Sequence, residues 1–550
     1  MGHYPQIIQG GMGAGVSDWR LARAVSKTGQ LGVVSGVALD QIFARRLQNG
    51  DPGGHLRRAL DHFPFPAMAE RVWNWLYIPG GKRPEDPYKT LKLIVKDGPR
   101  EIRELCLLAN FVEVWLAREG HNNPVGINYL EKVQMPHLPS AYGAMLAGVS
   151  YVLMGAGIPL KIPGMLDKLA LHEPATYPLE VDGAHEGDDT TMRFDPREYM
   201  ECDLPPLKRP MFLAIIASNL LSTVMLKRAD GRVDGFVVEG PTAGGHNAPP
   251  RGKLILDDQG EAVYGERDRV DLAKMRELGV PFWLAGGYGS PEMLNEALAE
   301  GATGIQVGTP FAYCAESGLD ERIKYDLLQQ VSDGRARVVT DLAASPTNFP
   351  FKVSVLEDSL SEGETYEARH RVCDLGYLRS AYKMPDGKLG YRCASEPVKT
   401  YVAKGGKEDN TAGRKCLCNA LMANIGLPQL RSGGYVERAL VTSGNDIVGL
   451  TRFLPDEGLT YTAADVVAKL LQPLVVRQAQ ESAEALVACS VEPLALPTAR
   501  PAGLLQISAR APSARCPHSP RLRHDRLWRT LQVYSCRRPP RTGGSGWDSF

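Results

Sequence analysis

Eight short apolar segments, mostly separated by stretches of helix length, constrain the fold of this chain more than any other feature. Each segment has the length and composition of a buried strand, and most end in glycine or small polar residues. Continuous apolar runs of this kind are typical of parallel sheets covered on both faces. The segments are 6–9, 31–35, 124–128, 151–157, 211–218, 235–238, 281–285 and 304–307.

Helix signals follow several of these segments. Ser17 or Asp18 is placed to cap a helix that runs to about Lys27, and Pro291 suits the first turn of a later one. The repetition predicts an α/β fold, a (β/α)₈ TIM barrel within residues 1–340. Insertions are expected at about 40–120 and 172–210. Helical and aromatic residues in the first insertion fit either an extra packing layer or a lid over a site.

The bulk composition is that of an ordinary globular protein. Of 550 residues, 43% are hydrophobic and 23% charged, and the formal net charge is zero. A neutral chain has no general attraction to nucleic acid or to an anionic membrane. No apolar run approaches the roughly 18 residues of a membrane span. Ten cysteines and a start without a signal-peptide pattern lead us to expect reduced thiols in the cytoplasm.

Glycine-rich loops gather at the carboxyl ends of the predicted strands, where barrels build their sites. They are Gly10–Gly13, Gly244-Gly245-His246, Gly286-Gly287 and Gly308-Thr309. A glycine pair alone is also typical of a simple tight turn. The last two loops, however, follow strands seven and eight, the usual phosphate cradle of this fold. Glycine amides, a hydroxyl and a helix N-terminus suit a phosphate dianion.

In these residues the chain resembles the FMN-dependent nitronate monooxygenase family, also called 2-nitropropane dioxygenases. The resemblance covers about Gln6 to Asp320 and rests on short motifs in the correct order. The matching stretches are 7–12, 125–128, 243–246, 285–287 and 306–309.

The resemblance implies bound FMN. Gly10, Gly11, Met12 and Gly13 would line the flavin ring, and Asn128 would hydrogen-bond near the ring or ribityl chain. The phosphate end would lie against the three later glycine loops. The cofactor-binding residues implied there are Gly244, Gly245, Gly286, Gly287, Gln306, Gly308 and Thr309.

One departure from the family pattern concerns the catalytic base. Many members carry a histidine after the fifth strand, but no histidine lies between Met211 and Asp230. An alkyl nitronate is already a carbanion equivalent and needs no base, so nitronates are favoured over neutral nitroalkanes as substrates. His246 is the catalytic candidate, either polarising the substrate or bracing the cofactor, and His137 is a weaker one.

Residues 345–472 exceed a minimal barrel and are expected to pack on its face or to form a homodimer contact. Cys373, Cys393, Cys416 and Cys418 fit either a metal site or ordinary buried thiols, and their spacing favours thiols. A basic cluster (Lys404, Lys407, Arg414, Lys415) fits a phosphate contact or a solvated turn. After Lys469 the chain has eleven arginines, nine prolines and no lysine. Residues 473–550 therefore fit a disordered tail, a frameshifted stretch or an RNA-binding tail.

The sequence predicts a flavin oxidoreductase that oxidises alkyl nitronates with O₂ to a carbonyl compound and nitrite. One rival is an NAD(P)H-dependent FMN enoyl reductase of fatty-acid or polyketide synthesis. The other is a non-enzymatic flavin- or metal-binding scaffold.

Overall fold

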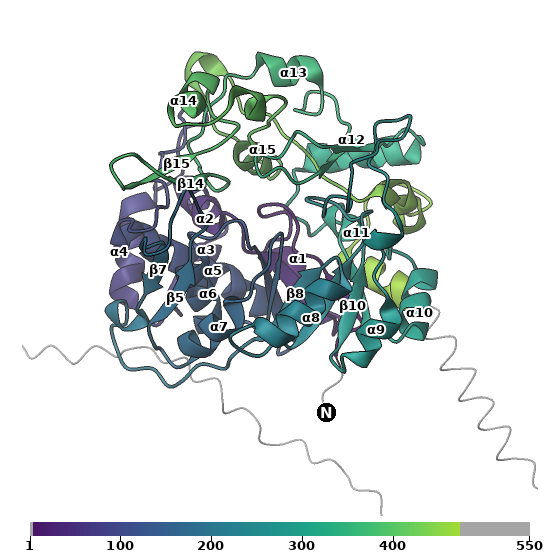
Figure 1. The fold of residues 1–550 in the computed structure, drawn as a ribbon, viewed down its shortest axis with the longest axis horizontal. Helices are drawn as coiled ribbons and strands as arrows, with labels where there is room; N and C mark the ends of the chain where they lie inside the picture. Colours follow the sequence, from purple (N-terminus) through teal and green to yellow (C-terminus); the bar gives the residue numbers. More distant parts are fainter. Residues whose placement is uncertain (1–3, 473–550) are drawn as a thin grey trace, which may run out of the picture. The chain divides into compact units, whose positions relative to one another are not determined.

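Eight parallel strands form the central sheet of the computed structural model, which describes residues 4–472 (Figure 1). Their order is β1-β11-β10-β9-β8-β4-β3-β2, and a parallel bridge between Ile8 and Leu31 joins the two outer strands. The ring is therefore a barrel, as predicted. Its strands are β1 (Ile7–Gln9), β2 (Gly32–Ser35), β3 (Val125–Leu130), β4 (Tyr151–Gly155), β8 (Met211–Ile216), β9 (Gly235–Glu239), β10 (Phe282–Ala285) and β11 (Gly304–Val307).

The inside of the barrel is a packed apolar core. Alternate residues of the strands point inward because side chains on a strand alternate between its two faces. The largest of them, Trp283, is fully buried and donates a hydrogen bond from Nε1 to the Pro5 carbonyl oxygen at 2.8 Å. The core residues are Ile8, Leu31, Val33, Tyr151, Leu153, Leu213, Val237, Trp283 and Ala285.

Helices connect successive strands, several of them with the caps that the sequence indicates. Asp18 accepts hydrogen bonds from the first turn of its helix, and Ser218 and Ser290 do the same for theirs. The helices are α1 (Trp19–Lys27), α6 (His137–Leu146), α7 (Ile162–Ala170), α8 (Asn219–Arg228), α9 (Leu272–Glu277), α10 (Pro291–Ala299), α11 (Thr309–Ala312) and α12 (Glu321–Ser332). None of the helices in residues 4–472 has the length and apolar character to cross a bilayer.

The insertion between β2 and β3 is a helical layer. It contains α2 (Leu39–Gln48), α3 (His55–Leu60), α4 (Pro66–Leu76) and α5 (Arg100–Arg118). Phe63 packs edge-on against both Phe65 and Phe111, with ring centroids 5.3 and 4.9 Å apart. No residue between 40 and 120 lines either of the two large cavities described below. This placement fits the packing-layer interpretation better than the lid.

The second insertion pairs with the C-terminal region. Its strands β5 (Ala175–Pro178) and β7 (Thr191–Phe194) are antiparallel to each other, whereas β6 (Val181–Asp182) runs parallel to β14. The C-terminal region contains β12 (Val338–Asp341), β13 (Phe351–Ser354), α13 (Gly363–Ala368), β14 (Ser380–Lys383), β15 (Leu389–Arg392), α14 (Val398–Ala403) and α15 (Leu417–Ala423). Short 3₁₀ helices are η1 (Pro196–Glu198), η2 (Glu266–Asp268), η3 (Glu408–Thr411), η4 (Ser432–Gly434) and η5 (Asn445–Phe453).

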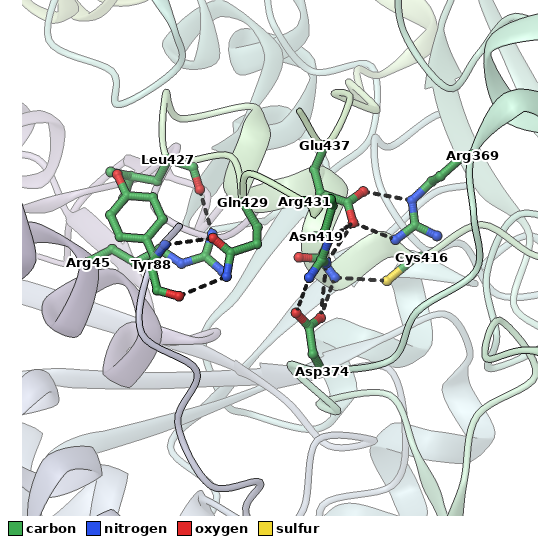
Figure 2. A network of polar contacts seen from close by, with 10 residues as sticks. All are labelled: Arg45, Tyr88, Arg369, Asp374, Cys416, Asn419, Leu427, Gln429, Arg431 and Glu437. Carbon is green, nitrogen blue, oxygen red and sulfur yellow. Dashed lines mark hydrogen bonds and ion pairs between the residues drawn. The ribbon is translucent and has the colours of Figure 1, made fainter. Parts of the chain in front are cut away.

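A buried chain of charges holds the C-terminal region together (Figure 2). Glu437 lies between Arg369 and Arg431, at 2.7 and 2.6 Å, and Arg431 also pairs with Asp374 at 2.6 Å. The Glu437 side chain is only 1% exposed. Beside this chain, Gln429 exchanges hydrogen bonds with the backbone of Tyr88 and so ties the region to the first insertion. The predicted tail, residues 473–550, lies outside the described residues.

Candidate functional site

A cavity of about 240 Å³ opens at the carboxyl ends of the barrel strands. Its walls come from the loops after β1, β9, β10 and β11 and from the carboxyl end of β3. The structure brings together in this one place His246 and all the predicted cofactor-binding residues. They are Gly10, Gly11, Met12, Gly13, Asn128, Gly244, Gly245, His246, Gly286, Gly287, Gln306, Gly308 and Thr309.

The glycines let these loops approach one another closely. Gly286 has φ +87°, a left-handed conformation that costs other residues free energy, and a Cβ there would lie 2.9 Å from the Gly240 carbonyl oxygen. A Cβ on Gly11 would lie 2.4 Å from Cβ of Asn128. Larger residues at these positions would push the walls apart, so the glycines set the width of the cavity.

Two buried side chains shape the loop after β1. Ser17 donates to the Gly10 carbonyl oxygen and accepts from the Met12 amide, both at 2.9 Å. Gln9 donates from Nε2 to the same Ser17 hydroxyl, also at 2.9 Å. Ser17 therefore supports the glycine loop, while Asp18 caps the helix. The sequence analysis gave neither Gln9 nor Ser17 this role.

One buried polar atom at the cavity has no protein partner. Oε1 of Gln306, on β11, is buried and makes no hydrogen bond to any described residue. An unsatisfied buried acceptor costs about 1–3 kcal/mol, so such an atom is usually met by water or a ligand. The cavity thus offers a hydrogen-bond acceptor to an N–H or O–H group of a ligand, next to the backbone of the glycine loops.

His246 is a neutral histidine wedged between aromatic rings. Its Nε2 lies 2.7 Å from the Ser345 hydroxyl, and its ring packs edge-on against Phe349 and Phe351. Burial lowers its pKa to about 4. A histidine with this pKa is uncharged at neutral pH and is a poor proton acceptor there, which favours the bracing role. His137 lines neither large cavity; its Nε2 lies 3.1 Å from the Leu130 carbonyl oxygen.

The C-terminal region supplies part of the cavity wall. The Thr442 hydroxyl accepts a hydrogen bond from the Gly245 amide at 2.7 Å, and the Gly444 amide donates to the Thr309 hydroxyl at 2.9 Å. Ser443 lies 2.6 Å from the Tyr313 hydroxyl. These contacts leave the Gly245 amide engaged within the protein. The region therefore packs on the barrel face and shapes the cavity, one of the two roles expected for it.

A second cavity, of about 260 Å³, adjoins the first. Ala156, Ile215, Glu239 and His246 line both. The remaining walls of the second cavity are largely apolar and include Ile158, Ile216, Leu221, Pro241, Pro249 and Phe349. The two volumes together fall in the range of small-molecule sites, roughly 300–1,000 Å³.

The four cysteines and the basic cluster have local structural roles. Within residues 4–472 no group of three or more His, Cys, Asp or Glu side chains is arranged to hold a metal ion. Arg414 donates to the carbonyl oxygens of Ala343 and Ser345, and Lys415 pairs with Asp341 at 2.6 Å. Lys404 pairs with Glu396 at 2.7 Å. Three of the cluster's four cations are thus engaged within the protein, which supports neither of the two interpretations offered for it.

Comparison with known proteins agrees with the site. A family model described as nitronate monooxygenase matches residues 206–343, which hold β8 to β11 and most of the glycine loops. A Saccharomyces cerevisiae protein named "Putative nitronate monooxygenase" is 26% identical over 184 residues, 32% of this chain and 42% of that protein.

A Mycobacterium tuberculosis protein is 32% identical over 101 residues, 18% of this chain and 25% of that protein. It is named a 5-hydroxy-7a-methyl-1-oxo-octahydro-1H-indene-4-carboxyl-CoA dehydrogenase. A solved structure of nitroalkane oxidase from Streptomyces ansochromogenes aligns with TM-score 0.41 and 15% identity over 88% of this chain and 97% of that one.

The chain thus spans less than half the length of these two curated relatives. The matched segment nevertheless contains the loops on which the resemblance depends. The resemblance predicted from them is confirmed: residues 206–343 match the nitronate monooxygenase family model, and the chain is similar to the yeast protein of that name.

Proposed function

We propose that the chain is a flavin-dependent oxidoreductase of nitronate monooxygenase type, with FMN bound in the first cavity. The observation that carries the proposal is the convergence of glycine loops from four barrel strands, β1, β9, β10 and β11, on one cavity. The match of residues 206–343 to the nitronate monooxygenase family model also supports it.

The residues present fit this cofactor. Gln306 offers an unpaired acceptor to an N–H group of the flavin ring, and Asn128 stands opposite the loop after β1. The backbone of Gly286 and Gly287 and the Thr309 hydroxyl would hold the phosphate end. When bound, FMN supplies an acceptor for the electron pair of the substrate and a route for those electrons to O₂.

The second cavity is the substrate space in this proposal. Its walls are largely apolar, and the buried Oδ1 of Asn247 has no partner among the described residues, so it can accept a hydrogen bond there. His246, on the border of both cavities, presents an uncharged ring to the substrate. An alkyl nitronate placed there needs no base before oxidation to a carbonyl compound and nitrite.

The polar residues near the position of the missing histidine have structural roles. Ser218 caps α8, and Ser222 and Thr223 donate to the backbone carbonyl oxygen of Asn219 at 2.8 and 3.0 Å. None of them is arranged as a proton acceptor. This absence is the reason for proposing nitronates as the substrate.

Anaerobic mixing of the FMN-loaded protein tests the proposal. Propionate 3-nitronate should bleach the flavin absorbance within seconds, and admitting O₂ should restore it with release of nitrite. Bleaching by NADPH together with no reaction with the nitronate would refute the nitronate activity.

A second candidate is an oxidoreductase for CoA or other thioesters, including the enoyl reductase predicted as a rival. The 32% identity to a carboxyl-CoA dehydrogenase over 101 residues favours it, as does an outer cavity large enough for an acyl group. In the same experiment, NADPH-dependent bleaching followed by reoxidation with crotonyl-CoA would establish this activity.

A further inference from the structure

Glu239 is a carboxyl group without a partner at the border between the two cavities. It is the last residue of β9, beside Ala285 on β10, and lines both cavities. Among residues 4–472, no hydrogen bond or ion pair reaches its carboxyl group. Buried carboxylates are normally paired, and an unpaired one at a cavity is a candidate for chemistry.

The surroundings of Glu239 favour the protonated form of its carboxyl group. Ala156 and Ile215 lie beside it at the border of the cavities, and desolvation raises its pKa to about 7. No nearby charge contributes to this shift. A carboxyl group poised near neutral pH is well suited to take up a proton and release it again.

The other titratable groups that line the two cavities are engaged elsewhere. In the outer cavity, Arg251 donates to the carbonyl oxygens of Arg267 and Ala217, Asp268 accepts from the Arg251 and Gly265 amides, and Tyr264 donates to the Ala248 carbonyl oxygen. In the inner cavity, Asp446 pairs with Arg452 at 2.8 Å and Tyr313 bonds to Ser443. His246 is uncharged and bonded to Ser345. Among the described residues that line these two cavities, Glu239 is thus the titratable side chain without a hydrogen bond or ion pair, and it can accept a proton.

We propose that Glu239 takes the proton from a neutral carbon acid bound between the two cavities, which extends the substrates from nitronates to nitroalkanes. The inference rests on the proposed flavin chemistry. The C–H bond breaks, its proton goes to a Glu239 carboxylate oxygen, and its electron pair stays on the substrate carbon, delocalised into the nitro group. Bound FMN would supply the acceptor for that electron pair, with O₂ as the final oxidant, and the proton would leave Glu239 for water through the outer cavity.

Glu239→Gln tests the role, with Glu266→Gln as the matched control because Glu266 is exposed and lines neither cavity. Anaerobic flavin bleaching is followed with freshly diluted nitroethane and, separately, with preformed ethyl nitronate. For Glu239→Gln we expect nitroethane bleaching to slow by about 10²–10⁴-fold, with the nitronate rate unchanged within about twofold. The nitroethane rate of Glu239→Asp should lie between those of wild type and Glu239→Gln, and the rates of Glu266→Gln should match wild type.

A measurement without flavin checks the same residue. Protein freed of cofactor is titrated between pH 5 and 9 by difference infrared spectroscopy, which detects a protonated carboxyl group. A signal component lost with a midpoint near pH 7 in wild type and absent in Glu239→Gln supports the assignment, whereas the Asp40 component, with a midpoint near pH 6, should be present in both. Titration of that signal below pH 5, or its persistence in the variant, contradicts it.

The outcomes separate the two proposals. No bleaching by either substrate refutes the flavin function itself. Bleaching by the nitronate but not by nitroethane in wild type, or equal nitroethane rates in wild type and Glu239→Gln, refutes the role of Glu239 alone. If Glu239→Gln fails to bind FMN, two other measurements test the role of Glu239. An infrared midpoint near pH 7 in wild type and a slower nitroethane rate in Glu239→Asp support it, and the opposite results refute it.

Discussion

Gly286→Ala should weaken FMN binding in addition to lowering the stability of the protein. Gly286 has φ +87°, and a residue with a Cβ in this left-handed conformation destabilises the folded state by about 1–2 kcal/mol. The new Cβ would also lie 2.9 Å from the Gly240 carbonyl oxygen, whereas ordinary contacts begin at 3.4 Å, so the loops after β9 and β10 must separate by about 0.5 Å. Binding sites tolerate displacements of only about 0.5 Å. We therefore expect the Kd for FMN to rise at least about tenfold, a change of about 1.4 kcal/mol.

Gly279→Ala is the matched control. Gly279 also has a positive φ, +68°, but a Cβ there meets nothing within 4 Å, and it lies outside both large cavities. Each variant is assayed by urea unfolding and by quenching of FMN fluorescence on titration with cofactor-free protein. Gly279→Ala should lose stability and keep wild-type affinity for FMN. Wild-type affinity in Gly286→Ala would refute the argument that these glycines set the cavity width.

Three further predictions concern the region around the site. Burial raises the pKa of Asp40 from 3.8 to about 6, so between pH 3.8 and 6 the folded state binds more protons than the unfolded state. The free energy of unfolding should therefore fall as the pH rises from about 4 to 6. Urea midpoints measured across this range should show the fall in wild type and not in Asp40→Asn. Glu437→Gln leaves the buried Arg369 without its ion-pair partner, while Arg431 keeps Asp374, and should cost about 3–5 kcal/mol in urea unfolding. The exposed Glu85→Gln should cost less than about 1 kcal/mol, and equal costs would contradict the buried network. Thr442→Val removes the hydrogen-bond acceptor of the Gly245 amide, which should lower the free energy of unfolding by about 1–3 kcal/mol and weaken FMN binding. Thr442→Ser should restore both the stability and the affinity. Unchanged FMN affinity in Thr442→Val would show that the C-terminal region does not shape the site.

The barrel was predictable because its strands carry a local signal. Each is an apolar run bounded by glycine or proline, and the structure places it close to the expected limits, as Phe282–Ala285 shows for the predicted 281–285. Parallel strands in turn put all their carboxyl ends on one side. That single topological fact brings together glycine loops that lie almost 300 residues apart in the chain, such as Gly10 and Gly308.

In the first insertion the sequence predicts helices at 57–60 and 100–116 but not α2 and α4, whose ends carry weak signals. The residue that caps α2, Ala38, has a left-handed conformation and no side-chain oxygen to accept a hydrogen bond. The cap of α4, Phe65, likewise offers no side-chain hydrogen bond. Packing against neighbouring helices stabilises these segments, and such packing has no local sequence pattern.

Parts of the site were missed for a related reason. Thr442 and Gly444 reach the cavity through hydrogen bonds to residues more than 130 positions away, and a short Thr-Ser-Gly run resembles any loop. Glu239 lies five residues before Gly244-Gly245-His246, yet a lone acidic residue at the end of a strand is unremarkable in sequence. Its altered pKa comes from burial beside residues of other strands, which only the fold brings together.

The identity of the bound cofactor tests the central claim most directly. The protein is purified without added flavin, denatured, and its released cofactor separated by chromatography and identified by mass; cofactor-free protein is then titrated with FMN. The account predicts close to one FMN per chain, bound in the purified protein or taken up on titration. A colourless protein that does not bind added FMN would contradict it.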